Sequence, residues 1–192
     1  MTGKTHQAIG MTSAATYFII TSEPLYNPAT FAAVIVGGSL GALLPDIDQP
    51  AAELWDKIPI VGHTAGKIAS KVTFGHRNIT HSLIGFVLMG YLIYKIIALF
   101  PLYWGIDHHE LFIAILLSYA AHLLADSFTV EGIPILFPYQ KMFGIPPKPF
   151  DGIRIQSGQW FENAIIFPLV NIVMLVIFFI NWDKIKAILL KN

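Results

Sequence analysis

Cysteine is absent from this 192-residue chain, and charged residues are scarce. Without cysteine there are no disulfide bonds, no thiol nucleophiles and no cysteine-ligated zinc, so a bound metal would have to rest on His, Asp and Glu. Asp, Glu, Lys and Arg together make up only 12% of the residues, and the twelve basic residues balance the twelve acidic ones. Because there is no basic excess, we expect no nucleic-acid partner.

Apolar residues dominate the composition. They make up 55% of the chain, and the mean hydropathy of +0.62 argues against an ordinary soluble globule. A helix needs about 20 mostly apolar residues to span a bilayer, and fewer when its polar ends lie in the interface. We predict an all-α, polytopic transmembrane bundle that forms a single domain over residues 1–192. Its five segments are residues 8–20, 29–44, 82–100, 111–128 and 164–180.

The connections between these segments differ in charge. The two short ones, residues 21–28 and 101–110, contain no Lys or Arg, whereas the two long ones, residues 45–81 and 129–163, contain seven. By the positive-inside rule both long loops are cytoplasmic, which predicts a multi-pass protein of the inner membrane. Five spans would place the basic C-terminal residues outside, so the fifth segment could instead be re-entrant or interfacial. Those residues are Lys184, Lys186 and Lys191.

Ionisable side chains are costly within a bilayer, so those beside the spans are candidates for function. They fall at the start of the first segment, after the second, before the third and near the end of the fourth: His6, Asp46, Asp48, His76, His81, His122 and Asp126. Because successive spans alternate in direction, these positions all face the same side of the membrane. The basic loops identify that side as the cytoplasmic one. We therefore predict that these side chains gather there.

Imidazoles and carboxylates without thiolates are typical ligands of zinc, manganese and iron(II). His122 and Asp126 are four residues apart in an apolar helix, so both project from one face and can bind one ion. Either His76 or His81 supplies a further imidazole, and His81 is favoured because its helix would hold it rigidly. We predict one or two divalent ions, zinc foremost, that activate water for hydrolysis. The predicted ligands are His6, Asp46, Asp48, His81, His122 and Asp126.

Catalytic roles are predicted for residues around this group. Asp48 and His76 are candidates for the chemical step, Arg77 could bind a phosphate bidentately, and Glu162 could act as a general base. Ordinary roles compete with these. Arg77 also fits an arginine that sets topology or meets lipid headgroups, Glu162 also fits a solvated helix start, and a helical His-x-x-x-Asp pair is often a structural hydrogen bond. The residues alone leave these alternatives open.

Four motifs carry a family resemblance. They are Thr5-His6, Leu44-Pro45-Asp46-Ile47-Asp48, His76-Arg77-Asn78-Ile79-Thr80-His81-Ser82 and His122-Leu123-Leu124-Ala125-Asp126. At these residues, which span the first two thirds of the chain, the sequence resembles the YdjM-like, membrane-bound metal-dependent hydrolases of bacterial and archaeal inner membranes. The resemblance implies a helical membrane protein with a metal-dependent hydrolase site built from these motifs.

The order of the motifs is also similar to that of zinc-dependent phospholipases C and related single-strand nucleases, which are helical enzymes with clustered zinc ions. In those enzymes an early His, a later Asp, another His and a helical His-x-x-x-Asp supply ligands. This chain lacks their second helical motif, His-x-x-x-Glu. The similarity therefore implies one or two ions, with Asp126 as the bridge between two. The residues that follow the shared order are His6, Asp46, His81, His122 and Asp126.

Together these observations predict a membrane-bound hydrolase whose metal-activated water cleaves a phosphoester of a lipid or lipid-linked substrate at the cytoplasmic interface. The alternative is a transporter or a metal-sensing membrane protein, because intramembrane His and Asp also line ion pathways. The concentration of polar residues at one end of the spans weighs against a continuous path. An intramembrane metalloprotease is disfavoured because His-Glu-x-x-His is absent. The sequence leaves the oligomeric state open.

Overall fold

The computed structural model describes residues 1–21, 27–52, 55, 62–73, 77–99 and 105–190. Within these ranges the chain forms α-helices and no β-strand, which confirms the all-α prediction there. The α-helices are α1 (Gly3–Thr21), α2 (Pro28–Gly41), α4 (Gly62–Val72), α5 (Leu83–Leu99), α6 (His108–Ser127), α7 (Phe167–Ile180) and α8 (Trp182–Leu189). The shorter elements are the 3₁₀ helices η1 (Leu44–Asp48) and η3 (Phe150–Ile153) and a π-helical turn, η4 (Glu162–Ile166).

Two stretches of helix are long and apolar enough to cross a membrane. They are α6 and the continuous run of η4 and α7, Glu162–Ile180; the shorter helices α2 and α5 are also apolar. No residue of α7 is buried, and large apolar side chains such as Leu175 and Phe179 are exposed along it. Because soluble proteins rarely expose a continuous apolar surface, α7 is suited to hydrocarbon rather than to water. The described residues thus contain two candidate spans, and the bundle of five stays a prediction.

Helices α1, α2 and α6 pack closely at glycine residues. A Cβ atom at Gly41 would lie 2.4 Å from the carbonyl oxygen of Ile115, and one at Gly10 would lie 2.7 Å from that of Gly38. Only glycine permits such a close approach of helix backbones, as at interfaces between membrane helices. The hydroxyl of Ser118 donates to the carbonyl of Gly10 across this interface at 2.9 Å. The glycines therefore set the spacing between the side chains that these three helices carry.

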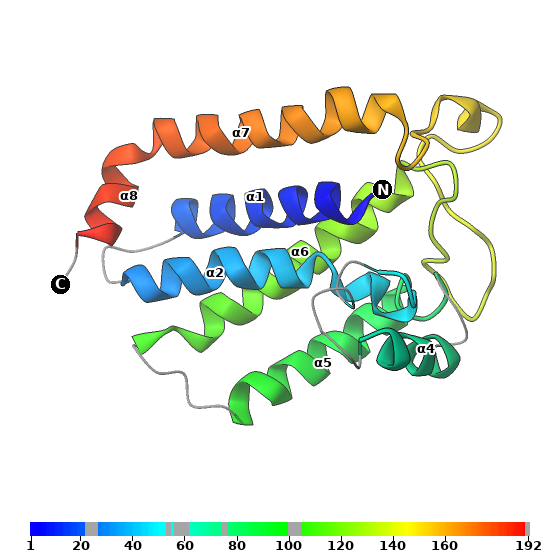
Figure 1. The fold of residues 1–192 in the computed structure, drawn as a ribbon, viewed down its shortest axis with the longest axis horizontal. Coiled ribbons are helices and arrows are strands. Elements are labelled where there is room, and N and C mark those ends of the chain that lie inside the picture. Colours follow the sequence, from blue (N-terminus) through cyan, green and yellow to red (C-terminus); the bar gives the residue numbers. More distant parts are fainter. Residues whose placement is uncertain (22–26, 53–54, 56–61, 74–76, 100–104, 191–192) are drawn as a thin grey trace.

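The C-terminal helix α8 turns back toward α2 at the end of the molecule opposite to the N-terminus (Figure 1). Ile185 joins a buried cluster that includes Phe18 and Phe31. The ammonium group of Lys184 donates to the carbonyl oxygen of Ile19 in the last turn of α1. A cation at a helix C-terminus satisfies carbonyls that have no partner within the helix. This contact gives a local role to one of the three lysines that conflict with the positive-inside rule.

The other end of the molecule gathers the start of α1, the end of α2, the start of α5, the end of α6 and the start of α7 (Figure 1). Alternating helix directions predict this arrangement. Residues 128–155 lie against the end of α6 through backbone hydrogen bonds, among them Ile155 N–H to Phe128 O at 3.0 Å and Ile145 N–H to Ser127 O at 2.7 Å. No α-helix forms in this loop, as its proline and glycine content predicts.

Candidate metal centre

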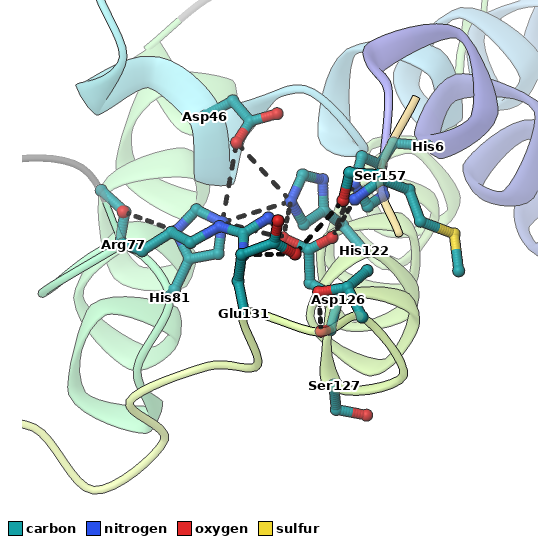
Figure 2. Close-up of polar contacts among 12 residues, drawn as sticks. His6, Asp46, Arg77, His81, His122, Asp126, Ser127, Glu131 and Ser157 are labelled. Carbon is teal, nitrogen blue, oxygen red and sulfur yellow. Dashed lines mark hydrogen bonds and ion pairs between the residues drawn. The ribbon is translucent and has the colours of Figure 1, made fainter. Parts of the chain in front are cut away.

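Side chains from four parts of the chain meet at this end of the helices (Figure 2). His6 comes from α1, Asp46 from η1 and His81 from the turn before α5, while α6 supplies His122 and Asp126. Two groups of three residues have donor atoms within 4.8 Å of one another, namely His6, His122 and Asp126, and Asp46, His81 and His122. Asp46 is partly buried and the other four are buried. The fold thus joins residues that are far apart in the sequence.

Four of the donor atoms are spaced as the ligands of a single ion would be. His81 Nε2 lies 3.3 Å from His122 Nε2. Asp46 Oδ1 lies 3.6 Å from His81 Nε2 and 3.8 Å from His122 Nε2, and Asp126 Oδ2 lies 3.7 Å and 3.8 Å from the same two atoms. Four tetrahedral ligands at ordinary zinc–nitrogen and zinc–oxygen distances lie about 3.3 Å apart. The residues present therefore fit a divalent ion with only small movements.

The hydrogen bonds of the two imidazoles fix their tautomers. His122 Nδ1 lies 2.6 Å from the carbonyl oxygen of Ala42, which can only accept, so Nδ1 carries the proton. The hydroxyl of Thr80 gives its proton to Asp48 and therefore accepts from His81 Nδ1 at 3.1 Å. Both Nε2 atoms are then left with lone pairs. Two lone pairs that face each other across 3.3 Å repel unless a metal ion or a shared proton lies between them.

Asp126 directs its two carboxylate oxygens to different parts of the cluster. Oδ1 lies 3.0 Å from Nε2 of His6 and accepts from the backbone nitrogen of Met1, while Oδ2 faces His81 and His122. The ring of His6 stacks on that of His122, with centroids 3.5 Å apart. Nε2 of His6 therefore has the carboxylate of Asp126 as a partner, whereas Nδ1 makes no hydrogen bond with a residue in the described part of the chain. A buried polar atom without a partner is costly, so Nδ1 is a position where a further ligand or water would be favoured.

Asp48 was predicted as a ligand together with Asp46, but the structure places it in neither group of donors. Its Oδ2 accepts hydrogen bonds from the backbone N–H of Arg77 at 3.1 Å and from the hydroxyl of Thr80 at 2.5 Å. In a 3₁₀ helix each residue turns by about 120°, so two side chains that are two residues apart point in different directions. Asp46 consequently lies with the histidines, whereas Asp48 holds the segment that carries His81.

Arg77 lies at the rim of the cluster in a backbone conformation that is unusual for a side chain. Its φ of 58° is in the left-handed region, which costs about 1–2 kcal/mol. Its guanidinium meets Asp126, with Nη2 2.8 Å from Oδ2, and also Glu131, with Nη1 3.6 Å from Oε2. Burial raises the pKa of Glu131, but a hydrogen bond from its own backbone and the charge of Arg77 outweigh burial and hold that pKa below its ordinary value. A cation held in this way could meet an incoming anion.

Glu162, a predicted general base, joins two parts of the backbone. Its Oε1 accepts from the N–H of Thr2 at 2.7 Å and from the Thr2 hydroxyl at 2.6 Å, and its Oε2 accepts from the N–H of Gly158 at 2.7 Å. The carboxylate is fully buried and belongs to neither group of donors. These contacts tie the start of α1, which carries His6, to the start of α7. The base role stays a prediction, and the contacts support a positioning role.

Substitution Glu162→Ala is expected to lower the free energy of unfolding by about 2–4 kcal/mol, because two backbone N–H groups and a hydroxyl lose their acceptor in a buried place. Thermal unfolding in detergent would measure the loss. Glu131→Ala is the matched control, since Glu131 is half exposed and we expect a change of less than about 1 kcal/mol. Loss of bound metal from Glu162→Ala at unchanged stability would contradict the positioning role and indicate a ligand.

The remaining predicted histidine, His76, lies outside the described residues. His81, the favoured alternative, is buried and its Nε2 faces His122. His108 and His109 begin α6 at the opposite end of that helix and are exposed.

Two positioning contacts were not predicted from the sequence. The hydroxyl of Tyr119 donates to the carbonyl oxygen of Thr80 at 2.6 Å and so holds the turn before α5. Helical periodicity could have indicated this residue, because Tyr119, His122 and Asp126 follow the i, i+3, i+7 spacing of one helix face. The contact of the Ala42 carbonyl with His122 leaves no signal in the sequence, since every residue has a carbonyl group.

Comparison with known proteins places the chain among membrane proteins. The family model described as YdjM inner membrane protein matches residues 1–186. A Bacillus subtilis (strain 168) protein described as uncharacterized protein YvsG is 34% identical over 171 residues, which cover 88% of this chain and 89% of that protein. Inner membrane protein YdjM of Escherichia coli (strain K12) is 32% identical over 114 residues, 59% of this chain and 53% of that protein. No solved structure matches. The chain therefore belongs to the YdjM inner membrane protein family.

Proposed function

We propose that the protein is a metal-dependent hydrolase that cleaves a phosphoester of a lipid or lipid-linked substrate. The observation that carries the proposal is the convergence of the Nε2 atoms of His81 and His122, 3.3 Å apart, with a carboxylate oxygen of Asp46 and one of Asp126 within 3.8 Å of both. Each imidazole is held in the required tautomer by a hydrogen bond on its other nitrogen, which is the usual arrangement of metal-binding histidines.

Zinc is the ion that these residues suit best, with manganese or iron(II) as alternatives, because the donors are imidazole nitrogens and carboxylate oxygens. Asp46, His81, His122 and Asp126 would hold one ion. His6 and the second oxygen of Asp126 would contribute to a second ion beside it, with Asp126 shared between the two. When bound, such an ion supplies Lewis acidity and lowers the pKa of water toward neutrality.

The residues of the chain would then position the substrate. Arg77 lies beside Asp126 with its side chain 15% exposed, and its guanidinium would orient a phosphate that approaches the cluster. The site lies at the ends of apolar helices, where a lipid can present its headgroup while its chains stay in hydrocarbon. The positive-inside rule supports an orientation in which five spans bring this end to the cytoplasmic face.

The test is release of phosphate or headgroup from lipids by the purified, zinc-loaded protein. We expect activity that a chelator removes and added zinc restores, because hydrogen bonds to Thr80 and to the Ala42 carbonyl orient the imidazoles of His81 and His122. Activity that is insensitive to the chelator would contradict the proposal. A flux of metal across proteoliposomes, without hydrolysis, would indicate a transporter instead.

A further inference from the structure

An apolar cavity of about 500 Å³ lies on another side of α6 from the histidines. Its walls come from α5, from α6 and from the loop after α6, and they include Leu83, Phe86, Leu123, Ile135 and Ile145. The volume falls within the range of ligand sites in proteins. The cavity is therefore large enough to hold a ligand, and the residues that line it indicate the chemistry of that ligand.

The residues that line the cavity are mostly apolar and suit a hydrocarbon ligand. Ser127 supplies the only side-chain hydroxyl among the lining residues of the described chain, and this hydroxyl donates to the carbonyl of Leu124 at 2.6 Å. The backbone N–H of Ile145, another lining residue, is bonded to the carbonyl of Ser127. A cavity whose polar groups are already satisfied does not favour water and does favour apolar ligands. Leu83 and Leu124 are each more than half exposed at its edge, so a chain can enter from the bilayer.

The cavity adjoins the candidate metal centre at two points. Ser127 follows Asp126 directly, so one turn of α6 contributes to both. On the loop, Ile133 lines the cavity, while the carbonyl of the preceding residue, Gly132, faces the guanidinium of Arg77 at 3.5 Å. A molecule with its phosphate at Arg77 would thus have the apolar cavity beside it.

A second, polar cavity of about 760 Å³ lies across the same loop. Phe143 and Gly144 line both cavities, and the polar one also contains the charged side chains Glu131, Lys141, Lys148, Asp151 and Arg154. The loop therefore separates an apolar space from a charged one, with Arg77 paired to Glu131 at the junction. A lipid has the same division, since its chain is apolar and its phosphate and headgroup are polar.

We propose that the apolar cavity binds the hydrocarbon chain of the phosphorylated substrate while the phosphate lies at Arg77 and the metal centre. This inference rests on the proposed function for the reaction, although the binding of the chain can be tested without it. The occupant is a flexible chain attached to a phosphate, and either an acyl-type or a prenyl-type chain has that chemistry.

Binding is tested with a decyl phosphate that carries a photoreactive diazirine at the end of its chain, added to the zinc-loaded protein. We expect crosslinks to the peptides that line the cavity, around residues 83–86, 120–127 and 133–145, and at least tenfold fewer in Ala120→Phe, which fills the cavity. Ile145→Trp fills it from the loop side and serves if Ala120→Phe does not fold. Ala98→Phe adds the same side chain at an exposed position of α5 and should leave the crosslinks unchanged.

Hydrolysis provides the second measurement. Each methylene moved from water into the cavity favours the substrate by about fourfold in kcat/KM, so water-soluble decyl phosphate should be cleaved far better than butyl phosphate. We expect Ala120→Phe to lower this ratio at least tenfold and Ala98→Phe to preserve it. Geranyl phosphate, compared with decyl phosphate, identifies which type of chain is preferred.

The outcomes separate the two proposals. Crosslinks outside the cavity, or an unchanged ratio in Ala120→Phe, would overturn the chain site even if hydrolysis occurs. Crosslinks confined to the cavity and lost in Ala120→Phe, without hydrolysis of any phosphate, would support the chain site and refute the hydrolase.

Discussion

His122→Ala is expected to weaken zinc binding by more than about 100-fold, the loss that removal of an outer-shell partner alone can cause. His122 belongs to both groups of donors and would be one of four ligands of the first ion, so its loss leaves that ion with Asp46, His81 and Asp126. Loss of a direct ligand should cost more than loss of an outer-shell partner, because a metal–nitrogen bond is removed. Calorimetric titration of the metal-free protein with zinc, together with elemental analysis, would measure the change.

His109→Ala is the matched control for this measurement. His109 is on the same helix, its side chain is 72% exposed, and it lies at the opposite end of α6 from the cluster. We expect it to bind zinc as the unchanged protein does. Zinc binding by His122→Ala as tight as that of the unchanged protein would refute the metal centre, and equal losses of affinity in both variants would show that the zinc binds to surface histidines.

Asp126→Asn is expected to lose both metal and stability, and the loss of stability should be about 3 kcal/mol. Breaking a buried ion pair from one side costs about 3–5 kcal/mol, and the lower end applies because Arg77 is partly exposed and keeps its contact with Glu131. The backbone nitrogen of Met1 loses a charged acceptor at the same time. Thermal unfolding of the metal-free protein in detergent isolates this cost from that of the ion.

Two further variants make this prediction specific. Asp183→Asn removes a carboxylate from the exposed first turn of α8 and should change stability by less than about 1 kcal/mol. When Arg77→Gln is already present, Asp126→Asn should lower the free energy of unfolding much less, because no partly buried guanidinium is left without its partner. Additive effects of Arg77→Gln and Asp126→Asn would show that the pair makes no energetic contribution and that Asp126 acts through other contacts.

Comparing His122→Ala with Asp126→Asn distinguishes the contribution of a residue to metal binding from its contribution to stability. Both should lose zinc, but in the metal-free protein His122→Ala leaves no charge without a partner and so should be destabilised mainly by the cavity it creates. Similar metal loss with different costs in stability would indicate two residues that share an ion and differ in their other contacts.

The general character of the chain could be predicted from its sequence. Apolar segments of nearly spanning length predict helices in a bilayer, and the described residues form helices over most of each of those segments. Alternation of helix direction predicts that His6, Asp46, His81 and His122 face one end, and the structure brings them together there. This inference needs only the order of the helices along the chain, because a side chain at a helix end stays at that end however the helices pack.

The assignment of each residue could not be predicted in the same way. Asp46 and Asp48 are equivalent in the sequence, yet the turn of η1 sends them to different partners. Glu162 has the sequence context of a solvated helix start, but it is buried against Thr2, which is 160 positions away. Side chains in irregular segments have no periodicity from which a direction can be calculated, so their partners depend on how the segments are packed.

The order of the amino acids is enough to predict a membrane protein, the end of the helices at which the ionisable residues lie and the donor groups available to a metal. The packing of the helices decides which donor atoms meet, which tautomers His81 and His122 adopt and which carboxylates hold the backbone. This is because the order and direction of the helices fix the position of a side chain along the helix axes, whereas ligand contacts depend on the separations between those axes. Those separations are set here by backbone contacts such as that of Gly41 with Ile115.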